Sequence, residues 1–498
     1  GGIWLNTQRP EWNDANNATV GNGLSMVTTC YLRKYVNFIK LLVERSILNN
    51  FQMFEALQIA IKNINKYLLE YRQDKISKYE LLNKMGTNYS NYCSSVYNKN
   101  FNSSEISKND LLKNLDLIFS LINSTIDNNK RNDYFYHSYN ILEHNKNKTD
   151  ISHQKLMLEG QVAVLTSNKL DLKQSVNLIS NLYKSSLFRP DQNSFILYPN
   201  KVDFSFLQRN QIPKKYNDYI SKNKFKGVFV KDVNSNYRFN SSIRNEFELK
   251  SYLDRQPIID KDNVKNILNI YDKTFNHKRY MGRSESMFGY EGINSIYWHM
   301  VSKLLLAIQE SYLRFYKNEN PSLLKDLGKL YYKVRQGLSW EKTADEYGAF
   351  PFDAYSHTPY HGIPQQPGMT GQVKEDILLR FGELGCFIKN GSLSFMPFLL
   401  RKDEFNKNSK IFNYFDLDNN EKTITVKDNE LAFTYCQVPI IYKLSIKEKQ
   451  SIKVHYKYKE CEEFNLNQLS IDDTNSITFR LNKINKIEYH LPESIIFN

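Results

Sequence analysis

The amino-acid sequence predicts a mainly helical body followed by an antiparallel β-sandwich. From about residue 24 to 385, apolar residues recur mainly at helical spacing. After residue 385 they alternate with polar residues, as in strands that have one buried face. The chain has 498 residues, of which 41% are hydrophobic, so it can bury a large core. We therefore expect a helical domain over 1–385 and a β domain over 386–498.

The helical domain is predicted from several stretches that carry an apolar stripe with polar intervals. These stretches are 24–47, 50–71, 110–126, 293–316 and 371–384. Together they are long enough to wrap a barrel or a bundle. The segments around 127–150 and 190–260 are rich in Asn, Lys, Asp and Ser, but Phe, Tyr and Leu keep returning in them. We interpret both as insertions into the helical domain rather than as disordered linkers.

The β domain is predicted from period-two alternation in segments such as "GCFIKNGSLSFMPFLL" (385–400) and "QSIKVHYKYKE" (450–460). β-branched and aromatic residues are frequent in these segments, and the Asn-Gly and Asp-Asn pairs between them are typical of turns. The pattern predicts an antiparallel β-sandwich of about 110 residues.

The overall charge and the cysteines exclude several classes of partner. The net charge is +14, but Lys and Arg are scattered and accompanied by Asp and Glu, which favours a solvated basic surface over a nucleic-acid groove. The 5 cysteines show no CxxC spacing, so a disulfide framework or a structural zinc site is not expected. No apolar run is long enough for a membrane span. We expect a cytoplasmic protein without nucleic-acid or membrane partners.

The first candidate site is "QRPEWNDANN" (8–17). Asp14 follows the aromatic Trp12 in an Asn-rich turn, and an aromatic wall raises the pKa of a carboxyl group towards that of a general acid. Arg9, Glu11 and the Asn side chains could bind sugar hydroxyls. The alternative is that Asp14 or Asn16 caps the helix that starts near residue 23.

The second candidate site is "GRSESMFGYEGINSIYWHM" (282–300). Glu291 lies beside a glycine and is followed by Trp298 and His299 near a helix start, which suits the rim of a ligand site. The alternative is that the histidine is a packed core residue beside the tryptophan.

The third candidate site is the long loop "YGAFPFDAYSHTPYHGIPQQPGMTGQVKE" (347–375), which ends at a predicted helix N-terminus. Backbone N–H groups there, with the hydroxyl of Thr370, could bind an anion or a sugar. The polar loop residues Tyr355, His357 and Gln366 are candidate substrate contacts. An Ω-loop that only closes a barrel end is the alternative. Pro359 separates His357 from His361, so we expect no metal site.

Taken in order, these sites resemble the inverting cellobiose and chitobiose phosphorylases. "EWNDANN" is similar to the family's "DWNDGMN"-type turn, and "YEGINSIYWH" to its "ENGGIYNH"-type segment. "PGMTG" before a helix resembles the family's Thr-Gly phosphate loop, although small residues usually follow where this chain has "QVKE". "FIKNGSLSFMPFL" (387–399) resembles the start of the family's C-terminal β domain.

The resemblance implies a fold and a set of residue roles. The helical domain would be an (α/α)6 barrel, incomplete here because the acid turn of the family lies midway through its barrel. We therefore expect a missing N-terminal portion of the same protein. The resemblance also implies a homodimer, since phosphorylases of this type are often dimers. Asp14 would be the general acid, while Trp12, Glu11, Arg9 and Glu291 would bind the sugar. Trp298 is a further candidate sugar contact at the second site. The phosphate-binding residues would be His299, Thr370 and Gly371.

These expectations predict an enzyme that cleaves β-linked gluco-oligosaccharides with inversion. Phosphorolysis to a sugar 1-phosphate is the first prediction, with inorganic phosphate as co-substrate and no other cofactor. An inverting hydrolase on the same scaffold is the alternative enzyme, and it would need a second carboxylate to activate water. A non-catalytic carbohydrate-binding or scaffold protein is the alternative from another class.

Overall fold

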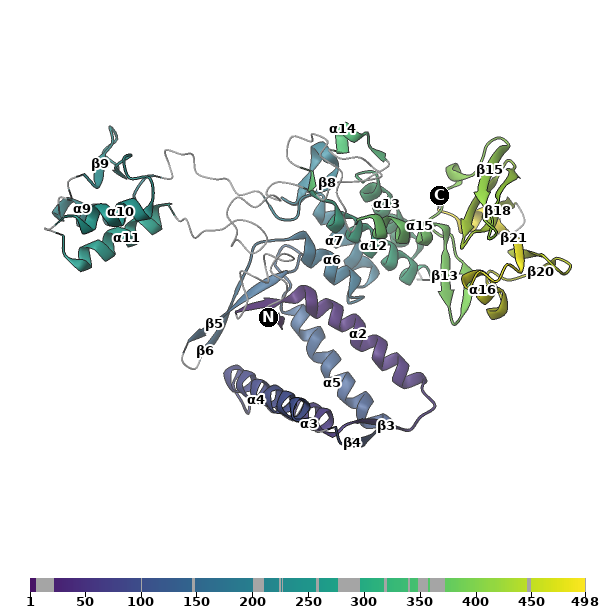
Figure 1. Ribbon diagram of the computed structural model, residues 1–498, viewed down its shortest axis with the longest axis horizontal. Coiled ribbons are helices and arrows are strands. Elements are labelled where there is room, and N and C mark those ends of the chain that lie inside the picture. The colour runs from purple at the N-terminus through teal and green to yellow at the C-terminus, as the bar shows by residue number, and fades with distance from the viewer. Residues whose placement is uncertain are drawn as a thin grey trace. The chain divides into compact units, whose positions relative to one another are not determined.

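The chain divides into two compact units, and Figure 1 shows its helices and strands coloured along the chain. The computed structural model describes residues 1–5, 22–99, 101–145, 148–199, 210–223, 225, 227–256, 259–275, 296–317, 320–338, 341–347, 357–358, 372–445 and 449–497. The first unit combines Gly1–Gly160 with Ile196–Ile296, and the second combines Gln161–Phe195 with Tyr297–Asn498. Among the described residues, no helix has the length and apolarity needed to cross a membrane.

Long helices make up much of the first unit. They are α2 (Met26–Arg45), α3 (Glu55–Arg72), α4 (Lys78–Tyr97) and α5 (Lys108–Asp127). α2 packs against α5, and α3 packs against α4. Serine side chains begin three of these helices, because the hydroxyls of Ser25, Ser77 and Ser107 accept hydrogen bonds from backbone N–H groups of the first turn. The remaining helix, α3, starts later than the apolar stripe over 50–71 predicts.

α3 starts late because the residues directly before it form a strand, although their apolar pattern is helical. Residues of the expected helix 50–71 begin as β3 (Asn50–Phe54), which pairs antiparallel with β4 (Ser103–Ser107). Strand pairing between segments about fifty positions apart is a tertiary interaction, so local periodicity does not report it.

An antiparallel sheet in the first unit has the strand order β1-β2-β5-β6. Its strands are β1 (Ile3–Trp4), β2 (Gly23–Ser25), β5 (Tyr139–Asn145) and β6 (Lys148–His153). The amide of the buried Asn140 donates hydrogen bonds to the carbonyl oxygen of Gly1 at 2.6 Å and to Oδ1 of Asn129 at 2.7 Å. These contacts hold the strand that leads into the Asp14 segment.

A small α/β module in the first unit has a core of its own. Its elements are η3 (Lys214–Tyr216), α9 (Asn217–Asn223), β9 (Phe229–Lys231), β10 (Tyr237–Phe239), α10 (Glu246–Asp254) and α11 (Lys261–Phe275). The core centres on Phe239, Leu249 and Ile267, each 1% exposed or less. β9 and β10 form a hairpin, and α10 packs against α11. The module overlaps the segment 190–260 that we interpreted as an insertion.

The second unit joins helices to the C-terminal strands. Its described helices before the C-terminal strands are α7 (Leu172–Leu182), α12 (Trp298–Phe315), α13 (Pro321–Arg335), α14 (Ala344–Tyr347) and α15 (Gln372–Leu384), while α6 (Leu158–Thr166) crosses the unit boundary. α12 packs against both α13 and α15. The expected domain boundary at residue 385 lies inside this unit, between α15 and the first strand of the β part.

The helical part of the chain also contains two pairs of short strands among the described residues. β7 (Phe188–Arg189) pairs with β8 (Ser194–Phe195) around η2 (Pro190–Gln192), and β11 (Ile296–Tyr297) pairs with β12 (His357–Thr358).

The C-terminal strands form two hairpins and a mixed sheet. The hairpins are β13 (Cys386–Lys389) with β14 (Ser392–Phe395), and β15 (Lys410–Phe415) with β16 (Glu421–Val426). The mixed sheet has the order β17-β18-β21-β19-β20. Its strands are β17 (Glu430–Tyr435), β18 (Val438–Ser445), β19 (Ser451–Tyr456), β20 (Glu462–Phe464) and β21 (Ile484–Pro492).

One strand pair in this sheet differs from the antiparallel arrangement that the sequence predicts. β18 and β21 are parallel. Parallel neighbours need a long crossover connection, and here that connection contains β19, β20 and the helix α16 (Ile471–Thr478). The alternating pattern identifies strands but not their order, so the β-sandwich stays a prediction.

Candidate functional site

His299 lies at the centre of a polar cluster in the second unit. Its Nε2 atom is 3.3 Å from Oε2 of Glu375, and its Nδ1 atom is 3.2 Å from the hydroxyl oxygen of Tyr297. The Tyr297 ring meets the imidazole edge-on, with centroids 5.8 Å apart and planes at 79°. The side chain of His299 is 17% exposed and that of Glu375 is 5% exposed. The imidazole is therefore held between a hydroxyl group and a buried carboxylate.

Two helix starts bring these groups together. His299 lies in the first turn of α12, and Glu375 lies in the first turn of α15. A carboxylate is favourable there because the N-terminal end of a helix carries partial positive charge. α12 and α15 pack against each other, and β11, which immediately precedes α12, pairs with β12, the strand of His357. The third predicted site therefore approaches the second at the start of these helices.

Most of the residues predicted for the site lie outside the described residues. They are Arg9, Glu11, Trp12, Asp14, Glu291, Tyr355, Gln366, Thr370 and Gly371. Of the predicted phosphate-binding residues, His299 is described, and it contacts a helix that begins directly after Gly371. Sequence analysis missed Glu375. The sequence does show an acidic residue shortly after the Thr-Gly turn. It was noted only as part of "QVKE", the segment in which this chain differs from the family it resembles.

Trp298, a predicted substrate contact, is fully buried at 0% exposure. The ammonium group of Lys342 lies 5.3 Å from the centre of the Trp298 ring. It also donates a hydrogen bond of 2.8 Å to Oε1 of Gln192. Burial lowers the pKa of Lys342 to about 8. This environment favours a packing role for the tryptophan over contact with a sugar ring.

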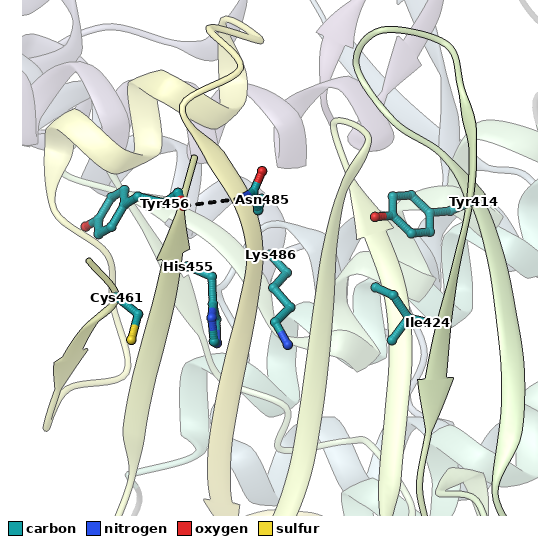
Figure 2. Close-up of a pocket in the computed structure, with 7 residues that line it drawn as sticks. All are labelled: Tyr414, Ile424, His455, Tyr456, Cys461, Asn485 and Lys486. Carbon is teal, nitrogen blue, oxygen red and sulfur yellow. Dashed lines mark hydrogen bonds between the residues drawn. The ribbon is translucent and has the colours of Figure 1, made fainter. Parts of the chain in front are cut away.

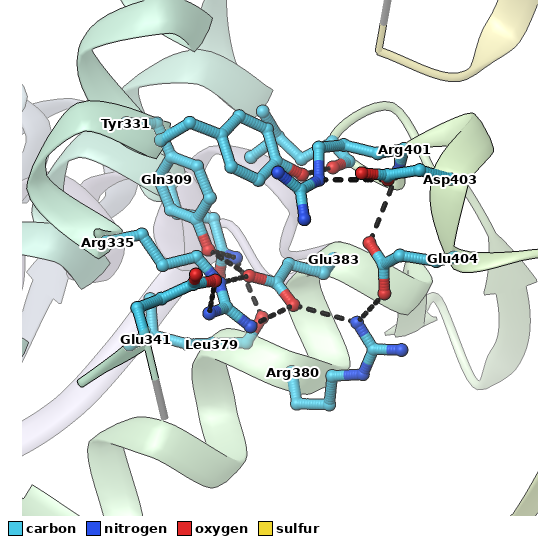
Figure 3. A network of polar contacts seen from close by, with 12 residues as sticks. Gln309, Tyr331, Arg335, Glu341, Leu379, Arg380, Glu383, Arg401, Asp403 and Glu404 are labelled. Carbon is cyan, nitrogen blue, oxygen red and sulfur yellow. Dashed lines mark hydrogen bonds and ion pairs between the residues drawn. The ribbon is translucent and has the colours of Figure 1, made fainter. Parts of the chain in front are cut away.

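Elsewhere in the second unit, a buried carboxylate joins α13 to α15 (Figure 3). Glu383 lies 2.6 Å from Nε of Arg335 and 2.9 Å from Nη1 of Arg380, and the hydroxyl of Tyr331 donates to it at 2.7 Å. Burial acts to raise the pKa of Glu383, but the hydrogen bonds and charge of Arg335, with Tyr331 and Arg380, lower it overall. Arg380 also pairs with Glu404 at 2.6 Å. These cations are already matched by carboxylates, so the network stabilises the helices rather than forming an anion site.

A cavity of about 350 Å³ lies on the C-terminal sheet (Figure 2). Tyr414 of the β15–β16 hairpin, and His455 and Lys486 of the mixed sheet, are among its lining residues. The Nζ atom of Lys486 lies 2.8 Å from Oε1 of Glu488, and the Nζ atom of Lys443 lies 3.1 Å from Oε2 of the same carboxylate. Burial would raise the pKa of Glu488, but Lys486 and Lys443 lower it to about 2. The charges of this cavity are therefore paired within the protein.

A family model of a glycoside phosphorylase domain matches part of this chain. The family model that matches is that of GH149 phosphorylase insertion domain 2, over residues 204–278. The matched segment contains the α/β module with its own core. The match does not single out the cellobiose and chitobiose phosphorylase type that the motifs resemble. A search of curated proteins finds no match.

Within the described ranges, no group of three or more His, Cys, Asp and Glu side chains is arranged to hold a metal ion.

Proposed function

We propose that this chain belongs to an inverting glycoside phosphorylase that cleaves β-linked gluco-oligosaccharides to a sugar 1-phosphate. The match of residues 204–278 to a phosphorylase insertion domain is the observation that carries the proposal. The order of the three sequence motifs supports it independently. The contact between His299 and the first turn of α15 adds further support, because the Thr-Gly motif directly precedes that helix.

The proposed reaction uses phosphate as the nucleophile. Asp14 protonates the glycosidic oxygen as the bond to the anomeric carbon breaks. A phosphate oxygen attacks that carbon from the opposite face, which gives a sugar 1-phosphate of inverted configuration and a shortened oligosaccharide. Because phosphate itself attacks, a protein base is not needed. Helix N-termini favour anions, so the start of α15 is a suitable place for phosphate.

The remaining site residues bind the substrates in this proposal. Trp12, Glu11, Arg9 and Glu291 contact the sugars, with Tyr355, His357 and Gln366 from the long loop. Thr370, Gly371 and His299 bind phosphate. We also propose that the helices belong to an (α/α)6 barrel and that the C-terminal strands form a β-sandwich-type domain.

Phosphate dependence tests the proposed function. Purified full-length protein is incubated with β-linked gluco-oligosaccharides of several linkages, with and without inorganic phosphate, and sugar 1-phosphate and reducing sugar are measured. A phosphorylase releases sugar 1-phosphate only when phosphate is present. Turnover to free sugar at the same rate without phosphate would instead identify the inverting hydrolase. Oligosaccharide binding without any turnover would identify the non-catalytic alternative.

A further inference from the structure

Glu375 is a nearly buried carboxylate whose side chain, 5% exposed, contacts an imidazole. Removing an ionised carboxylate from water is costly unless polar partners surround it. The Nε2 atom of His299 approaches Oε2 of Glu375 to 3.3 Å, which is longer than a charge-assisted hydrogen bond. The contact joins α12 to α15 beside the segment proposed to bind phosphate. The charge of a carboxylate at this place repels phosphate. Its presence there therefore calls for a role that outweighs this repulsion.

The geometry of the ring indicates that role. An ionised carboxylate can only accept hydrogen bonds, so the imidazole nitrogen facing Glu375 should carry the proton. The partner of one ring nitrogen determines which form the other presents. With the proton on Nε2, the Nδ1 atom of a neutral ring is an acceptor, and it faces the Tyr297 hydroxyl at 3.2 Å. The arrangement is a series of hydroxyl, imidazole and carboxylate, in which the carboxylate orients the ring.

We propose that Glu375 is a positioning residue that fixes the ring orientation and the proton of His299 for phosphate binding. This inference rests on the proposed function. Hydrogen phosphate has one P–O–H group, which donates a hydrogen bond to Nδ1 of His299, and its other oxygens are acceptors. The Tyr297 hydroxyl leaves Nδ1, which accepts a single hydrogen bond, and donates to one of these oxygens. The unprotonated oxygens therefore remain available for attack. No proton is transferred in this binding step, and the contact between Nε2 and Glu375 shortens as the complex forms.

Variants at Glu375 test this role in the full-length protein. Glu375→Ala removes the acceptor for Nε2–H, so the KM for phosphate should rise about tenfold, the effect of about one hydrogen bond. The KM for oligosaccharide should change less than about twofold, because Glu375 acts through a phosphate-binding residue. Glu375→Gln keeps an amide oxygen that accepts the same hydrogen bond, so it should restore most of the phosphate affinity.

Asp376→Asn is the matched control. It removes a charge one position along the same helix, at a residue that lines a separate cavity beside Arg335 and Glu383. The control should leave both KM values unchanged. An equal rise of both KM values in Glu375→Ala, or a lower kcat with an unchanged phosphate KM, would overturn the positioning role.

A spectroscopic measurement separates this inference from the proposed function. Long-range proton–nitrogen NMR spectra of the protein labelled with ¹⁵N-histidine distinguish the two neutral forms of the ring, and the His299 signal is assigned by its loss in His299→Gln. Wild type and Glu375→Gln should show the proton on Nε2, whereas Glu375→Ala should show a mixture. A wild-type proton on Nδ1 would overturn the inference even if phosphorolysis is observed. Absent phosphorolysis with the proton on Nε2 would overturn only the proposed function.

Discussion

The Nε atom of Arg335 lies 2.6 Å from Oε1 of Glu383, and this ion pair ties α13 to α15 in the helical part of the second unit. The side chain of Glu383 is 2% exposed, and Arg380 reaches its second oxygen at 2.9 Å. The orientation of α15, and with it the position of Glu375, therefore depends on a buried charge network.

Glu383→Gln should lower the free energy of unfolding by about 3 kcal/mol, because it leaves two guanidinium groups without their shared carboxylate. Denaturant unfolding followed by circular dichroism measures the change. Glu341→Gln is the control, since Glu341 pairs with the same Arg335 at 3.5 Å but is 39% exposed. It should cost less than about 1 kcal/mol. Equal effects of the two variants would show that burial does not determine the strength of this network.

Glu488, whose carboxylate pairs with Lys486 and Lys443, should make stability depend on pH in the acid range. Its pKa is lowered to about 2 from an ordinary value of 4.5, so the folded state favours the charged form. This stabilisation is present above about pH 4.5 and is lost as the pH falls towards 2. The melting temperature of wild type minus that of Glu488→Gln should therefore shrink across this window. Glu421→Gln, at an exposed position on β16, should show no such trend.

Lys342 should make stability rise with pH as well, but in the alkaline range. Burial lowers its pKa to about 8 from 10.5, so the unfolded chain binds the proton more tightly than the folded protein does. Stability contributed by this position should rise between about pH 8 and 10.5. The melting temperature of wild type relative to Lys342→Met measures it. A difference that stays constant or falls over this range would contradict the desolvated state of the lysine.

The α/β module should open as a local unit when its core is damaged. Phe239 is 1% exposed, and its replacement by alanine should cost about 3–5 kcal/mol of module stability. Hydrogen exchange measured by mass spectrometry should then show faster exchange over 210–275, with α12 and α15 unchanged. Val233→Ala is the control within the same module, because Val233 is 99% exposed. Faster exchange throughout the chain would show that the module core is coupled to the remainder.

Asp14→Asn separates acid catalysis from helix capping. Asparagine caps a helix about as well as aspartate, so this variant should keep its stability under either interpretation. A general acid contributes about 10²–10⁴ in rate, and phosphorolysis should fall by that factor. Asn16→Asp is a control for charge in the same turn and should change the rate little. Unchanged turnover in Asp14→Asn would exclude Asp14 as the general acid.

Local patterns predicted those parts of the fold that depend on neighbouring residues. The apolar stripe over 371–384 coincides with α15 because the period of an α-helix is visible within one segment. The Asn390-Gly391 pair joins β13 to β14 in left-handed conformations, with φ of 52° and 83°, that these residues adopt readily. The pattern over 50–71 misled the prediction at its first turn, where pairing with a distant strand produces β3.

The sequence by itself predicted helices that match α2, α5, α12 and α15 and the alternating strands of the C-terminal part, and its motifs predicted the chemistry of the proposed site. Only the tertiary structure showed that Glu375 lies against His299, that Trp298 is covered on all sides, and that β18 and β21 run parallel. Each of these is a contact or a burial that depends on segments remote along the chain. Helical and strand periodicity arise from backbone geometry over a few residues, whereas contacts between helices and strands depend on how the whole unit packs.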